Sequence, residues 1–485
     1  MGLRIAVAGA SGFVGQELIK RLLLNTDHLI RGLSRSVHEQ NSNERLQYTP
    51  CDLFSLKDAE RALEGIDVGI YLVHSMSPTA SLDQGSFQDY DLILADNFAR
   101  AAKKNGIKQI IYLSGIIPKD SEMSEHLSSR FEVEEVFRSH DLQVTALRAG
   151  MIVGNGGSSA TILMKIVDRM PVLFSPPWAK LKSQPVDVQN VIEAIEYTIL
   201  RPSCFNRYYD LGGPDILTYE EMLRVIASVI HKKRPIIQMP IAMFNVIRVT
   251  ARWISGAPKN LVNPLVGSLK HEVVADPAHA LHIPGQRWIG FQESIQKALH
   301  QGCLKTEPVV YRHHQNISKL KIVRSVQRMP LPSTMKADSV AFAYQHWLQK
   351  FLRPFLKIKK ESNMVSFIAK GLAQPLLKLE LSYQRSSPNR QLFYIRGGLL
   401  TMKETRGRLE FREVLNGRYM MAAIHDFKPR IPWWIYVLTQ APLHLFVMKS
   451  FSAWLNKAKM RHEYKYNGTK SFKRPSSKEY LKTAS

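Results

Sequence analysis

Three side chains that could handle protons or charge recur at four-residue spacing in HLSSRFEVEE, residues 126–135: His126, Arg130 and Glu134. On a helix this spacing places all three on one face. Histidine transfers protons near neutral pH, and a permanently charged arginine one turn away disfavours the imidazolium form. The pattern indicates a neutral imidazole that accepts a proton. Alternatively, His126 and Arg130 lie on the helix surface and Arg130 pairs with Glu134.

A glycine turn near the N-terminus has the spacing of a phosphate-binding loop. LRIAVAGASGFVGQELIKRLL reads as an apolar strand, a turn and an amphipathic helix. Gly9 permits the tight turn, Gly12 a close backbone approach to a pyrophosphate, and Gly15 close packing of helix on strand. A simple turn is the alternative interpretation. The expected binding residues here are Gly9, Ser11, Gly12, Phe13, Val14 and Gly15.

The end of the second strand, within HLIRGLSRS, bears on the choice of dinucleotide. About twenty residues after the turn, an acidic residue would bind the 2′-hydroxyl of NAD, but this chain has Ser34 and Arg35. An arginine suits the 2′-phosphate of NADP. We therefore expect NADP(H) to be preferred over NAD(H). Alternatively, Arg35 is an ordinary surface arginine.

Strands and helices continue to alternate through LQVTALRAGMIVG, residues 142–154, which predicts an α/β fold with a Rossmann-type, doubly wound parallel sheet. Ligands of such sheets lie at the carboxyl ends of the strands. The strand ends place Asp52 and Leu53 near the adenine, Val73, His74 and Ser75 near the ribose and nicotinamide, and Ser114 beside the reacting centre. Asp52 is alternatively a turn or helix-capping residue.

With these motifs the chain resembles an extended, atypical short-chain dehydrogenase/reductase of the NmrA-like group, which includes an accessory subunit of respiratory complex I. The resemblance covers roughly residues 1–300 and rests on GASGFVG, CDLFS, YLVHSM, IIYLSG, LRAGMIVG, QPVDVQNVIEAI and YYDLGGPDILTYEEML, in this order. Active members follow the serine with Tyr-x-x-x-Lys, whereas Ser114 is followed by His126 and Arg130. The resemblance therefore implies either altered chemistry or a dinucleotide-binding fold without chemistry.

Residues 151–300 are expected to form a small substrate lobe over the nicotinamide, as the resemblance implies. RMPVLFSPPWAKLKSQPVDVQNV and PIIQMPIAMFNVIRVTARWISG are rich in Met, Phe, Trp and Val. These side chains either line an apolar pocket or fill a core. Because no cluster of Arg and Lys accompanies them, they favour a hydrophobic or bulky substrate over a small polar one.

Charge divides the chain near residue 300. Residues 1–300 hold 32 Lys and Arg against 31 Asp and Glu, which leaves 34 basic and 10 acidic residues for 301–485. We expect domains at 1–305 and 306–456, with a basic, disordered tail at 457–485. The three cysteines, Cys51, Cys204 and Cys303, have no metal-ligand spacing, so we expect no metal site and a reducing, cytoplasmic location.

The basic second domain resembles a helix-grip fold of the SRPBCC or START-like kind, in which a curved antiparallel sheet wraps a long C-terminal helix around a hydrophobic cavity. Ile431 to Met448 is an uncharged run of 18 residues that is interrupted by prolines. A membrane span is one interpretation of this run, and a helix buried against the sheet is the other. Trp433, Trp434 and Trp454 with nearby Lys and Arg could sit at an anionic membrane surface.

Two functions fit the sequence. The first is an NADP(H)-dependent, oxidoreductase-like enzyme that acts on a hydrophobic carbonyl, quinone or lipid-like compound, with Ser114 and His126 as proton-handling candidates. The second is a non-catalytic NADP(H)-binding sensor or assembly factor peripheral to a membrane. No nucleic acid is expected as a partner, because no helix-turn-helix, zinc or RNA-binding pattern appears.

Overall fold

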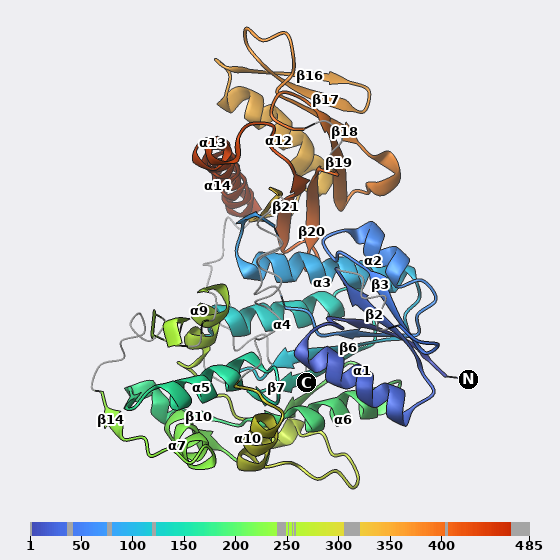
Figure 1. The fold of residues 1–485 in the computed structure, drawn as a ribbon. Coiled ribbons are helices and arrows are strands. Elements are labelled where there is room, and N and C mark those ends of the chain that lie inside the picture. Colours follow the sequence, from blue (N-terminus) through green and yellow to red (C-terminus); the bar gives the residue numbers. More distant parts are fainter. Residues whose placement is uncertain are drawn as a thin grey trace. The chain divides into compact units, whose positions relative to one another are not determined.

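The computed structural model describes residues 2–35, 42–74, 80–118, 123–239, 249–250, 252–254, 256, 259–304, 321–402 and 406–466. These residues form two units (Figure 1). Unit 1 comprises residues 1–77 and 94–314, and unit 2 comprises residues 78–93 and 315–485. The second unit therefore includes a short segment from the first quarter of the chain, which the sequence-based division at residue 305 did not contain.

Unit 1 is built on a seven-stranded parallel sheet with the strand order β12-β7-β6-β4-β1-β2-β3. Its strands are β1 (Arg4–Ala8), β2 (Leu29–Ser34), β3 (Leu46–Pro50), β4 (Val68–Tyr71), β6 (Gln109–Gly115), β7 (Val144–Ala149) and β12 (Arg207–Leu211). Most of their side chains are buried, as expected for a sheet covered on both faces. The order reverses between β1 and β4, which makes this the position for ligand binding at the carboxyl edge. The expected doubly wound parallel sheet is confirmed.

Helices cover both faces of this sheet. They are α1 (Phe13–Asn25), α2 (Leu56–Ala62), α3 (Phe87–Lys104), α4 (Glu125–Arg138) and α6 (Val188–Thr198), of which α1 and α6 pack on one another. On the other face, Phe98 of α3 packs edge-on against Tyr71 of β4, with ring centroids 5.1 Å apart. Phe137 of α4 approaches the same tyrosine at 5.0 Å. These aromatic contacts fix the helices on the strands whose ends carry the candidate site.

Smaller elements of unit 1 come between and after the last two strands of the parallel sheet, and several of them share a separate core around Met164, Met222 and Phe291. They are β8 (Ile152–Val153), α5 (Ser158–Arg169), β9 (Leu173–Ser175), β10 (Lys182–Ser183), β11 (Val186–Asp187), β13 (Leu217–Thr218), α7 (Tyr219–Val229), β14 (Ile236–Gln238), α9 (Lys259–Ser268) and α10 (Phe291–His300). Much of the Met- and Phe-rich sequence fills this core, and residues 240–248 of the second rich segment lie outside the described residues.

Unit 2 contains an eight-stranded sheet with the order β16-β17-β18-β19-β20-β21-β15-β5. Its strands are β5 (Leu82–Gln84), β15 (Val323–Pro330), β16 (Leu356–Glu361), β17 (Met364–Ala369), β18 (Leu377–Leu381), β19 (Arg390–Gly397), β20 (Arg408–Val414) and β21 (Tyr419–Phe427). All neighbours are antiparallel except β15 and β5. The apolar face packs on α12 (Ala337–Phe351), α13 (Trp433–Leu438) and α14 (Gln440–Tyr466).

The edge strand β5 is supplied by the segment that follows the fourth strand of unit 1. Leu82, Asp83 and Gln84 pair with residues 323–325 of β15. Nearby, Asp89 forms a 2.8 Å ion pair with Arg328. Unit 2 is therefore incomplete without residues 78–93.

The apolar run at 431–448 is divided between α13 and α14 rather than forming one helix. Helix α14 continues to Tyr466, ten residues past the expected domain end at 456, and residues 467–485 lie outside the described residues. Within the described part of the chain, every helix is too short or too polar to cross a membrane.

Candidate functional site

The glycine turn between β1 and α1 forms a cradle in which side chains would not fit. A Cβ on Gly9, whose φ is +89°, would lie 3.1 Å from the backbone of Leu72. A Cβ on Gly15 would lie 2.3 Å from the carbonyl oxygen of Gly9. Gly12 caps α1 without a side-chain hydrogen bond, so the first N–H groups of the helix have no capping side chain. This is the geometry that a pyrophosphate requires.

The other residues expected to bind the dinucleotide here are Ser11, which precedes α1, and Phe13 and Val14, which begin it. Ser11 uses its carbonyl oxygen to accept a 3.2 Å hydrogen bond from Gln16. Phe13 covers Gly154, whose Cβ position is 2.6 Å from the phenylalanine ring. Phe13 and Val14 also pack against the core of the parallel sheet. These two side chains hold the turn in place.

At the second strand, Ser34 is buried and Arg35 is exposed. The backbone oxygen of Ser34 accepts from the N–H of Cys51 at 2.8 Å, which joins the ends of β2 and β3. Arg35 directly follows β2 at the carboxyl edge of the sheet.

Asp52 and Leu53 have local structural partners. The Asp52 carboxylate accepts from the N–H of Phe54 at 3.1 Å, which makes the turn that precedes α2. The Leu53 carbonyl oxygen accepts a 2.7 Å hydrogen bond from the buried Asn97 side chain. The turn interpretation of Asp52 therefore has a structural basis, and any contact to adenine would be additional.

Ser114 lies near the carboxyl end of β6 and is buried. Its hydroxyl oxygen has no hydrogen-bond partner among the residues that the structure describes. A buried hydroxyl without a partner costs on the order of 1 to 3 kcal/mol. Such a group at the ligand edge of the sheet fits a bound molecule that would complete its hydrogen bonding.

His74 and His126 form a pair that the sequence did not predict. His74 follows β4, and His126 lies in the first turn of α4. Nε2 of His74 is 3.2 Å from Nδ1 of His126, and the ring centroids are 4.9 Å apart. One ring must donate a proton and the other must accept it, so the pair holds a shared proton. Both side chains are half-buried.

Helix α4 lies close against β6, and the contact is made by residues on both sides of Ser114. A Cβ on Gly115 would lie 3.3 Å from Leu127 and 3.9 Å from Arg130. The Tyr112 hydroxyl donates to the Arg130 carbonyl oxygen at 3.2 Å. The glycine thus permits the close approach that brings the start of α4 to the end of β6.

Glu134, which the alternative interpretation paired with Arg130, binds two other arginines in the structure. The buried Glu134 carboxylate binds Arg138 and Arg148, each with a shortest distance of 3.1 Å. Arg148 comes from β7, so the carboxylate joins α4 to the sheet. Glu134 therefore has a structural partner in the neighbouring strand, which the one-turn spacing along the helix did not reveal.

Asp210 near the end of β12 was not expected to be functional. Burial raises the pKa of its carboxyl group. One oxygen accepts from the N–H of Asp276 at 3.0 Å, and the other has no partner among the described residues. The sequence motif YYDLGGPD contains Asp210. A predicted strand that ends at Asp210 and Leu211 was the only signal that would have placed a polar group at the ligand-binding edge of the sheet.

Ser75 lies outside the described residues, although its neighbours Val73 and His74 follow β4 directly. Among the described residues, no group of three or more His, Cys, Asp or Glu could hold a metal ion. All three cysteines are buried and free. The groups available for chemistry are therefore hydroxyls, imidazoles and a carboxyl group.

Comparison with known proteins supports dinucleotide binding by the first part of the chain. Residues 9–169 match a family model described as NAD(P)H-binding. The chain is 28% identical over 127 residues to the auxiliary protein GraX of Staphylococcus aureus, which covers 26% of this chain and 40% of GraX. It is 24% identical over 250 residues to NADH dehydrogenase [ubiquinone] 1 alpha subcomplex subunit 9 of Arabidopsis thaliana mitochondria, which covers 49% of this chain and 61% of that protein. These matches span less than two thirds of either relative.

The parallel sheet also has relatives among solved structures. The NADPH-dependent quinone oxidoreductase QOR2 of Escherichia coli, determined with NADPH, superimposes with a TM-score of 0.50 at 17% identity. The match covers 61% of this chain and 99% of that enzyme, and at this identity it establishes the fold alone. The expected NAD(P)H-binding domain is confirmed. The domain is similar to NAD(P)H-binding proteins of the oxidoreductase-like and epimerase-like kinds.

Proposed function

We propose that this protein is an NADP(H)-dependent, oxidoreductase-like enzyme for a hydrophobic carbonyl, alcohol, quinone or lipid-like compound. The observation that carries the proposal is the His74–His126 pair at the carboxyl edge of an NAD(P)H-binding sheet. Two hydrogen-bonded imidazoles can take up a proton from a substrate and share it. In the proposed enzyme, His74 and His126 take over the proton handling that the tyrosine and lysine perform in active family members.

The residues of this chain divide into binding and proton-handling groups. Gly9, Gly12 and Gly15 would hold the pyrophosphate at the start of α1, and Arg35 the 2′-phosphate. A bound nicotinamide supplies hydride transfer. Ser114 would hydrogen-bond the substrate oxygen.

His126 is the proposed proton acceptor, with His74 as the group that shares the proton. The permanent charge of Arg130, one helical turn away, favours neutral imidazoles at pH 7. Neutral imidazoles accept protons, which favours oxidation of an alcohol, or proton removal next to a carbonyl, over reduction. His126, His74 and Ser114 would be catalytic residues in this reaction.

The nature of the substrate is proposed from the core of the smaller elements in unit 1. Partly buried apolar side chains such as Met151, Leu163 and Trp178 surround that core. Met151 lies between β7 and β8, and Leu163 and Trp178 follow β8, so all three come after Ser114 in the chain. An apolar environment of this kind suits a hydrophobic compound better than a phosphorylated or carboxylated one.

A second candidate function is a non-catalytic NADP(H)-binding sensor or assembly factor. The absence of the Tyr-x-x-x-Lys pair at His126 and Arg130 favours it, because the usual proton donor and the group that tunes its pKa are both replaced. In this case the dinucleotide is a structural ligand, and the two histidines only fix α4 against β4.

For unit 2 we propose a helix-grip domain at a peripheral membrane location. A strand, a helix, six further strands and a C-terminal helix follow each other in the chain from β15 to α14. The first strand lies beside the last, β21, which is the arrangement that a sheet wrapped around a long helix needs. The basic surplus of this part of the chain is the basis for an anionic membrane as partner.

Turnover by histidine variants tests the enzymatic proposal. His126→Ala and His74→Ala should each slow the reaction by about 100-fold or more and leave NADPH affinity nearly unchanged. His282→Ala, which alters an exposed histidine of unit 1, is the matched control. Unchanged rates in both variants would show that the histidine pair does not handle the proton, and the absence of any activity in the wild-type protein would support the non-catalytic candidate.

A further inference from the structure

Helix α14 is apolar on two faces, and only one of them is covered. Ala441, Val447, Met448, Phe451 and Leu455 are buried against the sheet. On the outer face, the exposed large side chains include Leu443 at 55%, Phe446 at 58% and Trp454 at 38%. Large apolar side chains exposed together on one face of a helix are typical of a binding surface. The outer face therefore needs an explanation beyond the core.

The outer face continues onto the neighbouring helix through stacked rings. Phe351 of α12 lies 6.0 Å from Phe446 between ring centroids and is itself 39% exposed. Trp347 stacks on Phe351 at 4.5 Å and contacts the buried Phe451 at 5.2 Å. We call the set of Phe351, Leu443, Phe446 and Trp454 the aromatic face. Its rings are anchored to the core, so they are held outward rather than collapsed.

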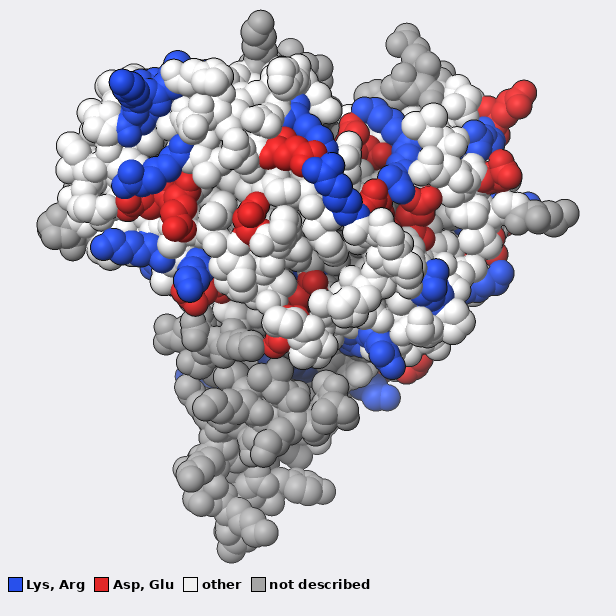
Figure 2. All heavy atoms as spheres, turned by 90° about the horizontal axis from the view of Figure 1, so that it is seen from below, with Lys and Arg blue, Asp and Glu red and all other residues white. Residues whose placement is uncertain are grey.

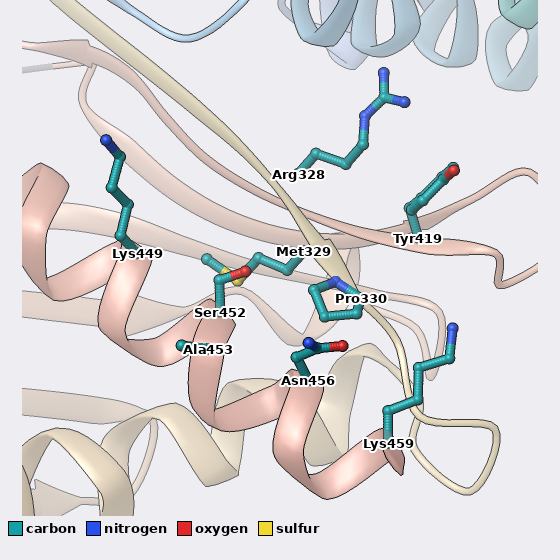
Figure 3. Close-up of a pocket in the computed structure, with 9 residues that line it drawn as sticks. All are labelled: Arg328, Met329, Pro330, Tyr419, Lys449, Ser452, Ala453, Asn456 and Lys459. Carbon is teal, nitrogen blue, oxygen red and sulfur yellow. The ribbon is translucent and has the colours of Figure 1, made fainter. Parts of the chain in front are cut away.

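A basic groove lies along the same helix. Figure 3 shows Lys449 and Lys459 projecting from α14 at the two ends of this groove, with Ser452 and Asn456 between them. Its volume is about 500 Å³. Arg328 from β15 also lines the groove, but it already binds Asp89. Ten residues of helix separate the two lysines, or about 15 Å along the axis.

Lys449 is exposed and lies three residues after Phe446, so this lysine borders the aromatic face on the helix surface. Lys459 lies at the far end of the groove, on another side of α14. Aromatic rings beside lysines are the composition of surfaces that lie at the headgroup level of a bilayer. The rings enter the acyl boundary, and the ammonium groups bind lipid phosphates.

We propose that the aromatic face, together with Lys449 at the end of the basic groove that borders it, binds an anionic phospholipid surface, with a lipid phosphate bound by Lys449. The inference rests on the peripheral location proposed for unit 2 and identifies the surface and the lipid chemistry. It is independent of the redox reaction. A second copy of the chain is a poorer occupant, because a symmetric contact would bring the same lysines together.

Co-sedimentation of the full-length chain with vesicles tests this surface. The protein should bind vesicles of phosphatidylcholine with phosphatidylglycerol and bind those of phosphatidylcholine alone much more weakly. Lys449→Glu should weaken binding by about 10- to 30-fold, because an attractive charge becomes a repulsive one. Phe446→Ser should weaken it by about 10-fold through lost apolar contact with the acyl boundary.

Two variants in unit 1 serve as controls. Lys57→Glu makes the same charge change on the exposed surface of α2, and Leu24→Ser removes an exposed apolar side chain of α1. Both should bind vesicles like the wild type. NADPH affinity and the unfolding midpoint, unchanged in all four variants, would show that each one is folded.

Four outcomes would overturn the proposal. If the wild type ignores anionic vesicles, both the surface and the peripheral location are wrong. If it binds them but Lys449→Glu and Phe446→Ser bind equally well, the peripheral location stands and the surface is wrong. If light scattering detects a dimer that Phe446→Ser abolishes, and vesicles are not bound, the aromatic face is an interface between copies. Displacement by inorganic phosphate at constant ionic strength, with Phe446→Ser unaffected, would point to a free anion instead.

Discussion

Replacing Gly15 by alanine tests the phosphate cradle with a single methyl group. The new Cβ would lie 2.3 Å from the Gly9 carbonyl oxygen, whereas ordinary contacts begin at 3.4 Å. The backbone must therefore move by roughly 1 Å, the difference between the two values. Because the obstacle is backbone, a side-chain rotation cannot relieve the contact.

A movement of this size would take the N–H groups at the start of α1 out of hydrogen-bonding distance of a pyrophosphate. Each charge-assisted hydrogen bond contributes on the order of 1.5 to 3 kcal/mol, so losing one or two should weaken NADPH binding by at least about 10-fold. Calorimetric titration measures the affinity. Gly267→Ala is the control, because a Cβ there meets nothing within 4 Å. Equal NADPH affinities of Gly15→Ala and the wild type would refute the cradle.

Three further predictions concern the cofactor, a buried ion pair and acid stability. Arg35→Ala should abolish a preference for NADPH over NADH of about 1.5 to 3 kcal/mol, and titrations showing no preference in the wild type would contradict it. Glu134→Gln should destabilise unit 1 by roughly 3 to 5 kcal/mol in denaturant unfolding, because Arg148 stays buried without its carboxylate; Glu17→Gln, in an exposed pair, should cost less than about 1 kcal/mol. Burial lowers the pKa of His444 to about 4, so the unfolded chain takes up a proton first as pH falls below 6.5. Stability present above pH 6.5 should then be lost toward pH 4, by at most about 1.4 kcal/mol per pH unit, and His444→Asn should reduce this loss in unfolding scans.

The sequence predicted the parallel sheet because each of its signals is local. The turn at Gly9, Gly12 and Gly15 needs glycine for reasons of space, and the buried strands read as continuous apolar runs. The near balance of basic and acidic residues over residues 1–300 could also be predicted from the sequence. Figure 2, which views the molecule from the side of α7 and α10, shows basic and acidic side chains interspersed rather than gathered into a patch of one sign.

Features that depend on distant contacts were not predictable. The three residues of β5 show no alternating pattern, and their partner strand begins about 240 residues later. The partner of Glu134 is Arg148 on a neighbouring strand, whereas its spacing along α4 pointed to Arg130. His74 was expected near the nicotinamide and His126 near the substrate, but only the fold brings their rings within 3.2 Å.

The uncharged run at 431–448 had two interpretations, and the structure supports packing against the sheet rather than a membrane span. A membrane span requires one continuous helix, whereas packing on a sheet requires only one apolar face. The structure divides the run at Thr439 and leaves Leu443 and Phe446 exposed while Val447 is buried. Hydropathy reports how much of a segment is apolar, and it cannot report which of two apolar faces is covered.

The central claim is that this dinucleotide-binding chain performs proton-coupled hydride chemistry through the His74–His126 pair. The most direct measurement is the rate at which full-length protein, loaded with NADP⁺, reduces it on mixing with long-chain alcohols, compared with the same alcohols deuterated at the transferred hydrogen. We predict turnover with a primary isotope effect and a loss of about 100-fold in His126→Ala. Tight binding of NADP⁺ without its reduction by any of these alcohols, together with no oxidation of NADPH by the corresponding aldehydes or by short-chain quinones, would contradict the claim.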